Sequence, residues 1–70
     1  MEDIKARVGN RIRELRQQKA LSQEAMGPLV GMHRTYLSNV EQGKRNISLE
    51  NLEKLWSFFG VSAEEFFHGI

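Results

Sequence analysis

The sequence predicts an all-α fold built from five short helices. Apolar residues recur three and four positions apart through most of the 70-residue chain, which is the periodicity of one face of an α-helix. No segment alternates apolar and polar residues in the manner of a half-buried β-strand, and no internal repeat is visible. Because the connections between the expected helices are all short, residues 1–70 are expected to form a single domain without a linker.

The first helix is expected to run from about Asp3 to about Lys19. One of its faces is rich in arginine and lysine. The opposite face is predicted to pack on the core, because its apolar positions recur at helical spacing: Ile4, Val8, Ile12 and Leu15.

Each later helix is expected to begin after a residue that can accept a backbone N–H. Ser22, Ser48 and Ser62 are such N-caps, whereas the third helix follows Met32 or His33, and histidine is a poorer cap than serine. At all four starts an apolar residue precedes the cap and pairs with another five positions later. This is the spacing of a hydrophobic staple: Leu21 with Met26, Met32 with Leu37, Ile47 with Leu52, and Val61 with Phe66.

The fourth helix is expected to bury an apolar stripe and to end at Gly60. The second helix contains a conflict at Pro28, since proline removes a backbone donor and crowds the preceding turn at a cost of about 3 kcal/mol. We therefore expect the second helix to be kinked or shortened. The stripe of the fourth helix comprises Leu49, Leu52, Leu55, Trp56 and Phe59.

Residues 21–45, LSQEAMGPLVGMHRTYLSNVEQGKR, form a helix-turn-helix pattern. Gly31 can adopt the left-handed conformation that a sharp turn needs, and the small Gly27 lets one helix cross the other at close range. Leu37 and Val40 then face inward. The rest of the third helix forms an outward surface, which comprises Arg34, Thr35, Tyr36, Ser38 and Asn39.

The charge distribution favours a polyanion as the partner of this surface. The formal net charge is only +1, but residues 5–45 hold nine Lys and Arg against three Glu, a net +6. Residues 46–70 hold one Lys against four Glu, a net −3. A basic segment that contains a helix-turn-helix pattern is typical of a DNA-binding face. The alternative is a solvated surface with an uneven charge.

Arg34 and Thr35 are the main candidates for reading DNA bases, because they lie in the first turn of the third helix. A guanidinium can donate two hydrogen bonds to guanine, and the threonine methyl group suits thymine. Asn39 follows about one turn later and can contact a base edge or a phosphate. Tyr36 stands at the edge of the surface, where core packing and base contact fit its position equally well.

A second group of residues is expected to contact DNA phosphates. Gln23 begins the second helix, where N-terminal N–H groups attract anions. Such contacts have no sequence preference and should weaken steeply as salt rises. The other candidates lie on the third helix and in the loop that follows it: Ser38, Lys44, Arg45 and Asn46.

Two further predictions concern stability and assembly. Arg16 and Glu41 are expected to form an ion pair in the seam between the first and third helices. Residues 56–70 hold five of the six aromatic residues, so Phe58, or Phe67 with Ile70, is expected to form an exposed apolar patch through which two copies associate. A two-fold dimer would place two reading helices about 34 Å apart and would select a palindrome.

The segment LSQEAMGPLVGMHRTYLSNVEQG resembles the helix-turn-helix of the phage-repressor-like family, the Cro/C1 or Xre type, and the resemblance covers nearly the whole chain. Within that family, HRTYLSNVEQGKRNISLENLEKL is similar to the controller proteins of bacterial restriction-modification systems. The resemblance implies a compact five-helix transcription factor that binds palindromic operators as a dimer. The sequence departs from the family at Gly27, where alanine is usual, and at Pro28, where proline is not favoured.

The resemblance also implies roles for individual residues. The base-reading positions of the family fall on Arg34, Thr35, Tyr36 and Asn39. Its phosphate positions fall on Gln23, Arg45, Asn46 and Ser48, and its ion pair between the first and third helices falls on Arg16 and Glu41.

Composition argues against several other classes of protein. The chain has no cysteine, which fits a reducing cytoplasm, and it has no cluster of metal ligands. It also lacks the long apolar run of a membrane anchor and the apolar N-terminal segment of a signal peptide. His33 and His68 lack a matching nucleophile or carboxylate, so no enzyme and no catalytic, cofactor or metal site is expected. A contact with RNA polymerase is a further candidate interaction. The alternative functions are a phage-type repressor, an antitoxin regulator, and a protein-interaction module that does not use DNA.

Overall fold

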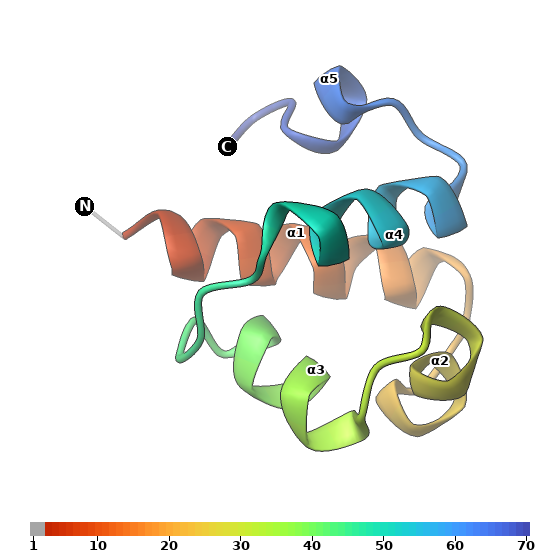
Figure 1. Cartoon of the computed structure of the whole chain (residues 1–70). Helices are drawn as coiled ribbons and strands as arrows, with labels where there is room; N and C mark the ends of the chain where they lie inside the picture. Colours follow the sequence, from red (N-terminus) through yellow and green to blue (C-terminus); the bar gives the residue numbers. More distant parts are fainter. Residues whose placement is uncertain (1–2) are drawn as a thin grey trace.

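The computed structural model describes residues 3–70 and contains five α-helices (Figure 1). They are α1 (Ile4–Gln18), α2 (Gln23–Val30), α3 (Arg34–Glu41), α4 (Leu49–Phe59) and α5 (Ala63–Phe66). No β-strand occurs among the described residues. The predicted all-α fold and the place of each expected helix are therefore confirmed.

The helices begin where the sequence supplies a cap. His33 caps α3 with its imidazole, because the backbone N–H of Thr35 donates to Nδ1 over 3.1 Å. The sequence placed the start of this helix after Met32 or His33, and His33 is the residue that caps it. The other four helices begin at a carboxylate or hydroxyl that accepts an N–H from the first turn: Asp3, Ser22, Ser48 and Ser62.

The helices lie in three layers (Figure 1). α1 and α4 cross the middle of the molecule, α2 and α3 lie on one side of them, and α5 lies on the other. α3 packs against α1 and α2, and α5 packs against α4. α3 therefore has the core on one side and solvent on the other. The core contains Val8, Ile12, Leu15, Met26, Val30, Met32, Leu37, Val40, Leu52, Leu55, Phe59 and Phe66.

The turn between α2 and α3 depends on Gly31, whose backbone is left-handed as predicted, with φ 70° and ψ 31°. Gly27 has a different role from the expected one. A Cβ atom there would lie 2.6 Å from the carbonyl oxygen of Met32, so its small size makes room for the turn itself rather than for a helix crossing. Pro28 lies inside α2, which continues to Val30, so the proline does not end the helix.

Gly9 marks a close approach of α1 and α3 that the sequence pattern did not reveal. A Cβ atom on Gly9 would lie 2.4 Å from the carbonyl oxygen of Val40 and 2.7 Å from that of Glu41. The two helices therefore meet through their backbones. This contact brings the C-terminal end of α3, including Glu41, directly beside α1.

Two residues of the predicted apolar faces lie outside the core. Leu49 is 79% exposed and Ile4 is 51% exposed. Each is the first residue of its helix, where the helix end extends past the elements that cover its middle. Within residues 3–70, no helix combines the length and the apolar character needed to cross a lipid bilayer.

Candidate nucleic-acid interface

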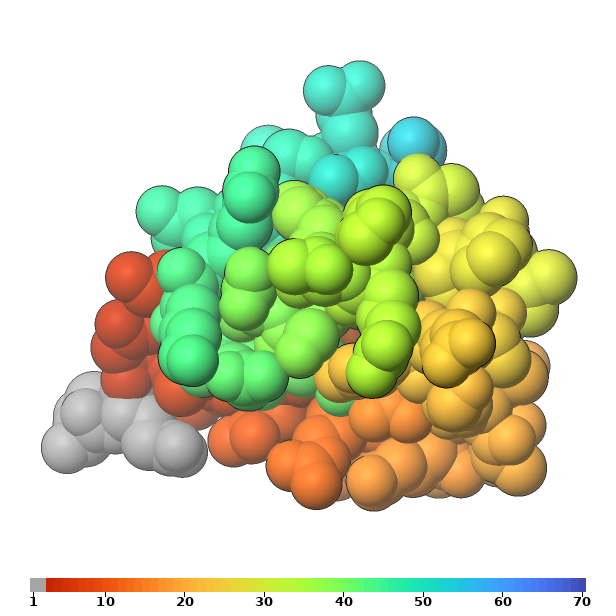
Figure 2. All heavy atoms as spheres, turned by 90° about the horizontal axis from the view of Figure 1, so that it is seen from below, coloured from red at the N-terminus to blue at the C-terminus, as the bar shows by residue number. Residues whose placement is uncertain are grey.

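α3 forms an outer surface of the molecule, and Figure 2 shows this surface face-on with the α3 residues in green at its centre. Arg34 and Thr35 are both exposed in the first turn of α3. Their orientation follows from Leu37 and Val40, which are fully buried on the opposite side. Within residues 3–70, neither the guanidinium of Arg34 nor the hydroxyl of Thr35 has a hydrogen-bond partner. Both side chains are therefore available to a ligand.

The next three candidates on α3 are only half-exposed. Tyr36 packs against the core, and its hydroxyl accepts a hydrogen bond from Nδ2 of Asn51 on α4 over 3.0 Å. The sequence left core packing and base contact equally open for Tyr36, and the structure shows the packed arrangement. Ser38 accepts a hydrogen bond from Nε2 of Gln42 over 2.9 Å, and Asn39 is half-buried beside it.

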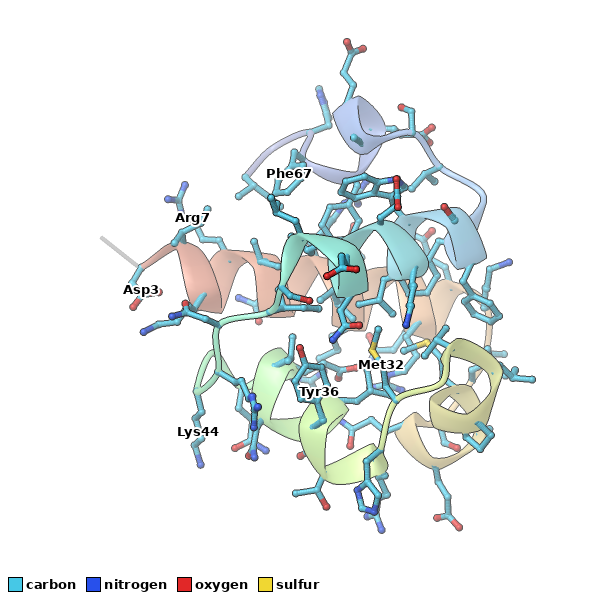
Figure 3. All side chains as sticks on the ribbon, in the orientation of Figure 1. Asp3, Arg7, Met32, Tyr36, Lys44 and Phe67 are labelled. Carbon is cyan, nitrogen blue, oxygen red and sulfur yellow. The ribbon has the colours of Figure 1, made fainter. Side chains whose placement is uncertain are left out.

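The loop between α3 and α4 presents a group of exposed polar side chains. Lys44, Arg45 and Asn46 are all exposed, and Figure 3 shows Lys44 pointing away from the body of the protein. The guanidinium carbon of Arg45 lies 4.9 Å from the centre of the Tyr36 ring, which is a cation–π contact. Ser48 ends the loop, and its hydroxyl caps α4. The loop therefore places two cations beside the exposed face of α3.

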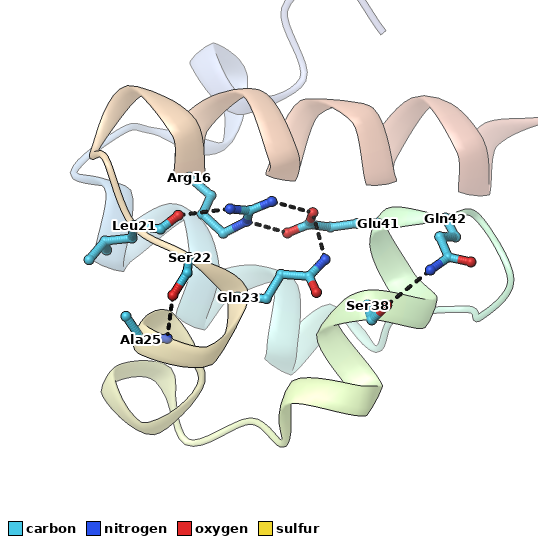
Figure 4. A network of polar contacts seen from close by, with 8 residues as sticks. All are labelled: Arg16, Leu21, Ser22, Gln23, Ala25, Ser38, Glu41 and Gln42. Carbon is cyan, nitrogen blue, oxygen red and sulfur yellow. Dashed lines mark hydrogen bonds and ion pairs between the residues drawn. The ribbon is translucent and has the colours of Figure 1, made fainter.

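Arg16 and Glu41 form a two-point ion pair between α1 and α3 (Figure 4). Nε of Arg16 lies 2.8 Å from Oε2 of Glu41, and Nη2 lies 2.9 Å from Oε1. The Glu41 side chain is only 3% exposed. Its hydrogen bonds with the guanidinium raise the pKa of Arg16 above the ordinary value, while desolvation opposes the rise. The remaining Nη1 of Arg16 donates to the carbonyl of Leu21, just before α2, over 2.7 Å.

Gln23 is joined to this ion pair. Its Nε2 donates to Oε1 of Glu41 over 3.1 Å, so the amide at the start of α2 has a fixed orientation (Figure 4). A polar hollow of about 290 Å³ opens beside the amide, between α1, α2 and α3. Arg13, which the sequence interpretation did not single out, is exposed at its edge. The hollow is lined by Arg13, Arg16, Gln23, Ser38, Glu41 and Gln42.

Part of the positive charge of α1 faces away from α3. Nε of Arg11 donates to the carbonyl of Phe66 over 2.8 Å, and Nη2 donates to the carbonyl of Glu65 over 2.8 Å. Nη1 of Arg7 donates to the carbonyl of Ile70 over 2.9 Å. Arg11 therefore binds the end of α5 and Arg7 binds the last residue of the chain, on the side of the molecule opposite α3 (Figure 1). The net +6 counted over residues 5–45 therefore overstates the charge on the α3 surface.

Apolar side chains are exposed on another part of the surface. Phe67 is 37% exposed and lines, together with Ile4 and Ile47, an apolar hollow of about 220 Å³ between α1 and α4. Figure 3 shows Phe67 above the start of α4. Leu49, the first residue of α4 and two residues after Ile47, is a further exposed apolar side chain. This hollow was not expected from the sequence.

The other two residues predicted for the apolar patch are partly covered. Phe58 packs edge-on against Phe59, with 5.7 Å between the ring centres, and Nζ of Lys19 lies 5.7 Å from the centre of its ring. Ile70 is half-buried against the core. Phe67 is thus the most exposed of the three predicted residues, and the apolar surface is centred on Phe67 rather than on Phe58.

Comparison with known proteins places this geometry among DNA-binding regulators. A family model described as "Helix-turn-helix" (HTH_3) matches residues 12–66. The control protein C.MunI of Mycoplasma sp is 46% identical over 71 residues, an alignment that covers 100% of this chain and 96% of that protein.

Solved structures agree with the sequence matches. The restriction-modification controller protein C.AhdI from Aeromonas hydrophila has a TM-score of 0.83 and 43% sequence identity, with 90% of this chain and 96% of that chain covered. The controller C.Esp1396I, solved as a tetramer in complex with its natural 35 base-pair operator, has a TM-score of 0.84 and 28% identity, with 97% and 90% covered.

Proposed function

This chain belongs to the helix-turn-helix family of the Cro/C1 type, together with the restriction-modification control proteins, and from that premise we propose that it regulates transcription by binding a palindromic operator as a dimer. The observation that supports this most directly is the exposed first turn of α3, where the side chains of Arg34 and Thr35 have no hydrogen-bond partner within residues 3–70. The proposal gives the chain no catalytic role, as expected for this family of regulators.

In this proposal some side chains of the α3 surface contact DNA bases, and others contact the phosphates of the DNA backbone. Arg34 donates to a guanine and Thr35 contacts a thymine, with Asn39 and the edge of Tyr36 beside them. Phosphates are bound from the start of α2 and from the loop after α3. The residues assigned to phosphates are Gln23, Ser38, Lys44, Arg45, Asn46 and Ser48.

Replacing Arg34 with alanine should relax the sequence preference at one base pair of each half-site. The loss of a two-point contact with guanine is expected to reduce discrimination at that position by about 1–3 kcal/mol. The measurement is selection of bound duplexes from random DNA, carried out in parallel with the wild-type chain and the Arg34→Ala variant.

Lys44→Ala is the matched comparison for Arg34→Ala. Loss of a phosphate contact should weaken binding to all sequences alike and reduce the slope of log affinity against log salt by about 1. If Arg34→Ala behaves like Lys44→Ala, with lower affinity and an unchanged preference, Arg34 does not read a base.

We assign the dimer contact to the apolar surface formed by Phe67, Ile4 and Leu49. All three are large exposed apolar side chains, and Ile4 and Phe67 line the same hollow. Arg45 and Asn46 of the loop after α3 line the same hollow as Ile4 and Phe67, so this surface lies beside that loop. A two-fold axis at the surface would make the two α3 helices symmetry-related. The named relatives include a controller that forms a tetramer on its operator.

Phe67→Ser should shift the chain toward the monomer at micromolar concentration. A central aromatic contact of this kind is expected to raise the dimer dissociation constant by about 30-fold, as measured by sedimentation. Leu29→Ser is the control, because Leu29 is 61% exposed on α2, outside this surface. Leu49→Ser tests the same surface with little risk to folding. An unchanged dimer in both the Phe67 and Leu49 variants would rule out this assignment.

We further propose that the chain is a single domain that acts in the cytoplasm on restriction-modification genes. The identity to C.MunI over the full chain supports this choice over a phage-type repressor or an antitoxin regulator. A restriction endonuclease gene and a methyltransferase gene beside its own gene would bear it out. We also propose a contact between this chain and RNA polymerase. Tight, salt-sensitive and sequence-selective DNA binding would exclude a module that contacts proteins alone.

A further inference from the structure

Asn51 is connected to the candidate phosphate contact at Arg45 through one intermediate side chain. Nδ2 of Asn51 donates to the Tyr36 hydroxyl over 3.0 Å, and the Arg45 guanidinium lies over the ring of Tyr36 at 4.9 Å. The three residues come from α4, α3 and the loop between them. Asn51 is half-buried and Arg45 is exposed, so the connection runs from the interior to the surface.

Asn51 is itself held in place by the start of α4. Its backbone N–H donates to the hydroxyl of Ser48, the N-cap of that helix, over 3.1 Å. The side-chain amide of Asn51 thus projects from a backbone with few alternative conformations. Tyr36 packs against the core, and the Arg45 guanidinium lies over its ring.

We propose that Asn51 is a positioning residue for DNA binding, which acts through Tyr36 to hold Arg45 where it can meet a phosphate. This inference rests on the proposed function, because it needs a DNA backbone for Arg45 to bind. An arginine in an exposed loop loses much rotamer freedom when it binds a phosphate. Stacking on a fixed ring removes part of that freedom before DNA arrives, so less is lost on binding.

A different role would be purely structural, in which the bond between Asn51 and Tyr36 only ties α4 to α3. The two roles differ in what they predict for DNA. A structural bond affects the melting temperature and leaves the affinity of the folded protein unchanged. A positioning bond changes the affinity and the salt dependence even where the protein is fully folded.

The test compares Asn51→Ala, Tyr36→Phe and Arg45→Ala on a duplex recovered by the wild-type chain from random DNA, at a temperature where every variant is folded. Asn51→Ala and Tyr36→Phe should each weaken binding by about threefold to tenfold. The combination of the two should be no weaker than either one. In an Arg45→Ala background, Asn51→Ala should have no further effect. Ser57→Ala, a neutral change at an exposed position of α4, is the control and should bind as the wild type does.

The possible outcomes separate this inference from the proposed function. An Asn51→Ala variant that melts earlier but binds with unchanged affinity and salt slope would overturn the positioning role alone. The same conclusion follows if the double variant loses as much binding free energy as Asn51→Ala and Arg45→Ala lose together. A wild-type chain that selects no duplex from random DNA would overturn the proposed function and the positioning role together.

Discussion

Arg16→Ala should destabilise the protein by about 3–5 kcal/mol, because it leaves the carboxylate of Glu41 buried without its partner. Glu41 is 3% exposed and Arg16 supplies both of the guanidinium nitrogens that its oxygens bind. The variant also leaves the Leu21 carbonyl without the donor it now has. The core of a domain of this size rarely supplies more than about 3–5 kcal/mol of net stability. Much of the Arg16→Ala protein should therefore be unfolded at room temperature.

Chemical denaturation followed by circular dichroism measures this loss. Arg13→Ala is the matched control, since it removes an exposed arginine one turn earlier on the same helix, and its stability should stay within about 0.5 kcal/mol of the wild type. Replacing both partners, Arg16→Met with Glu41→Met, should recover much of the loss, because no buried charge then remains. If the denaturation midpoint of Arg16→Ala equals that of the wild type, the ion pair contributes nothing to stability.

Gly9→Ala should destabilise the protein by about 3 kcal/mol, the upper end of the usual range for overpacking a core. The added Cβ would lie 2.4 Å from the Val40 carbonyl oxygen and 2.7 Å from the Glu41 carbonyl oxygen. Both atoms belong to the backbone of α3, so they can move only if the whole helix moves. That movement would also separate Arg16 from Glu41. The higher helix propensity of alanine offsets only about 1 kcal/mol of the loss.

Asn10→Ala is the comparison for Gly9→Ala. Asn10 is the next residue of α1 and is exposed, so the change should be neutral or slightly stabilising. Thermal unfolding of the two variants, measured side by side, tests the prediction. If Gly9→Ala has the same melting temperature as the wild type, the added Cβ does not force α1 and α3 apart and the prediction is wrong.

The helix boundaries could be predicted because their determinants are local. The hydroxyls of Ser22, Ser48 and Ser62 each accept a hydrogen bond from the backbone N–H three residues later. The turn at Gly31 also depends on one backbone conformation. The exposure of Arg34 and Thr35 could be predicted because Leu37 and Val40, on the opposite side of the same helix, face the core.

Features that depend on distant segments could not be predicted. Gly9 looks like any glycine in a helix until α3 is placed beside it, and Asn51 has no signal that connects it to Tyr36. The basic face of α1 was interpreted as one surface, although Arg7 and Arg11 bind main-chain atoms 63 and 55 residues away. Leu49 fits the apolar spacing of α4 but lies at a helix end that the core does not reach.

The bonds from Arg7 and Arg11 join the two ends of the chain into one cooperative unit. Terminal segments usually fray, yet here the last turns are anchored to the first helix, so their amides should exchange with solvent more slowly than those of an unanchored chain end. Phe67 belongs to this anchored segment, so the apolar surface around it should also be rigid. A second copy would then meet a preformed shape, and association would lose little conformational entropy.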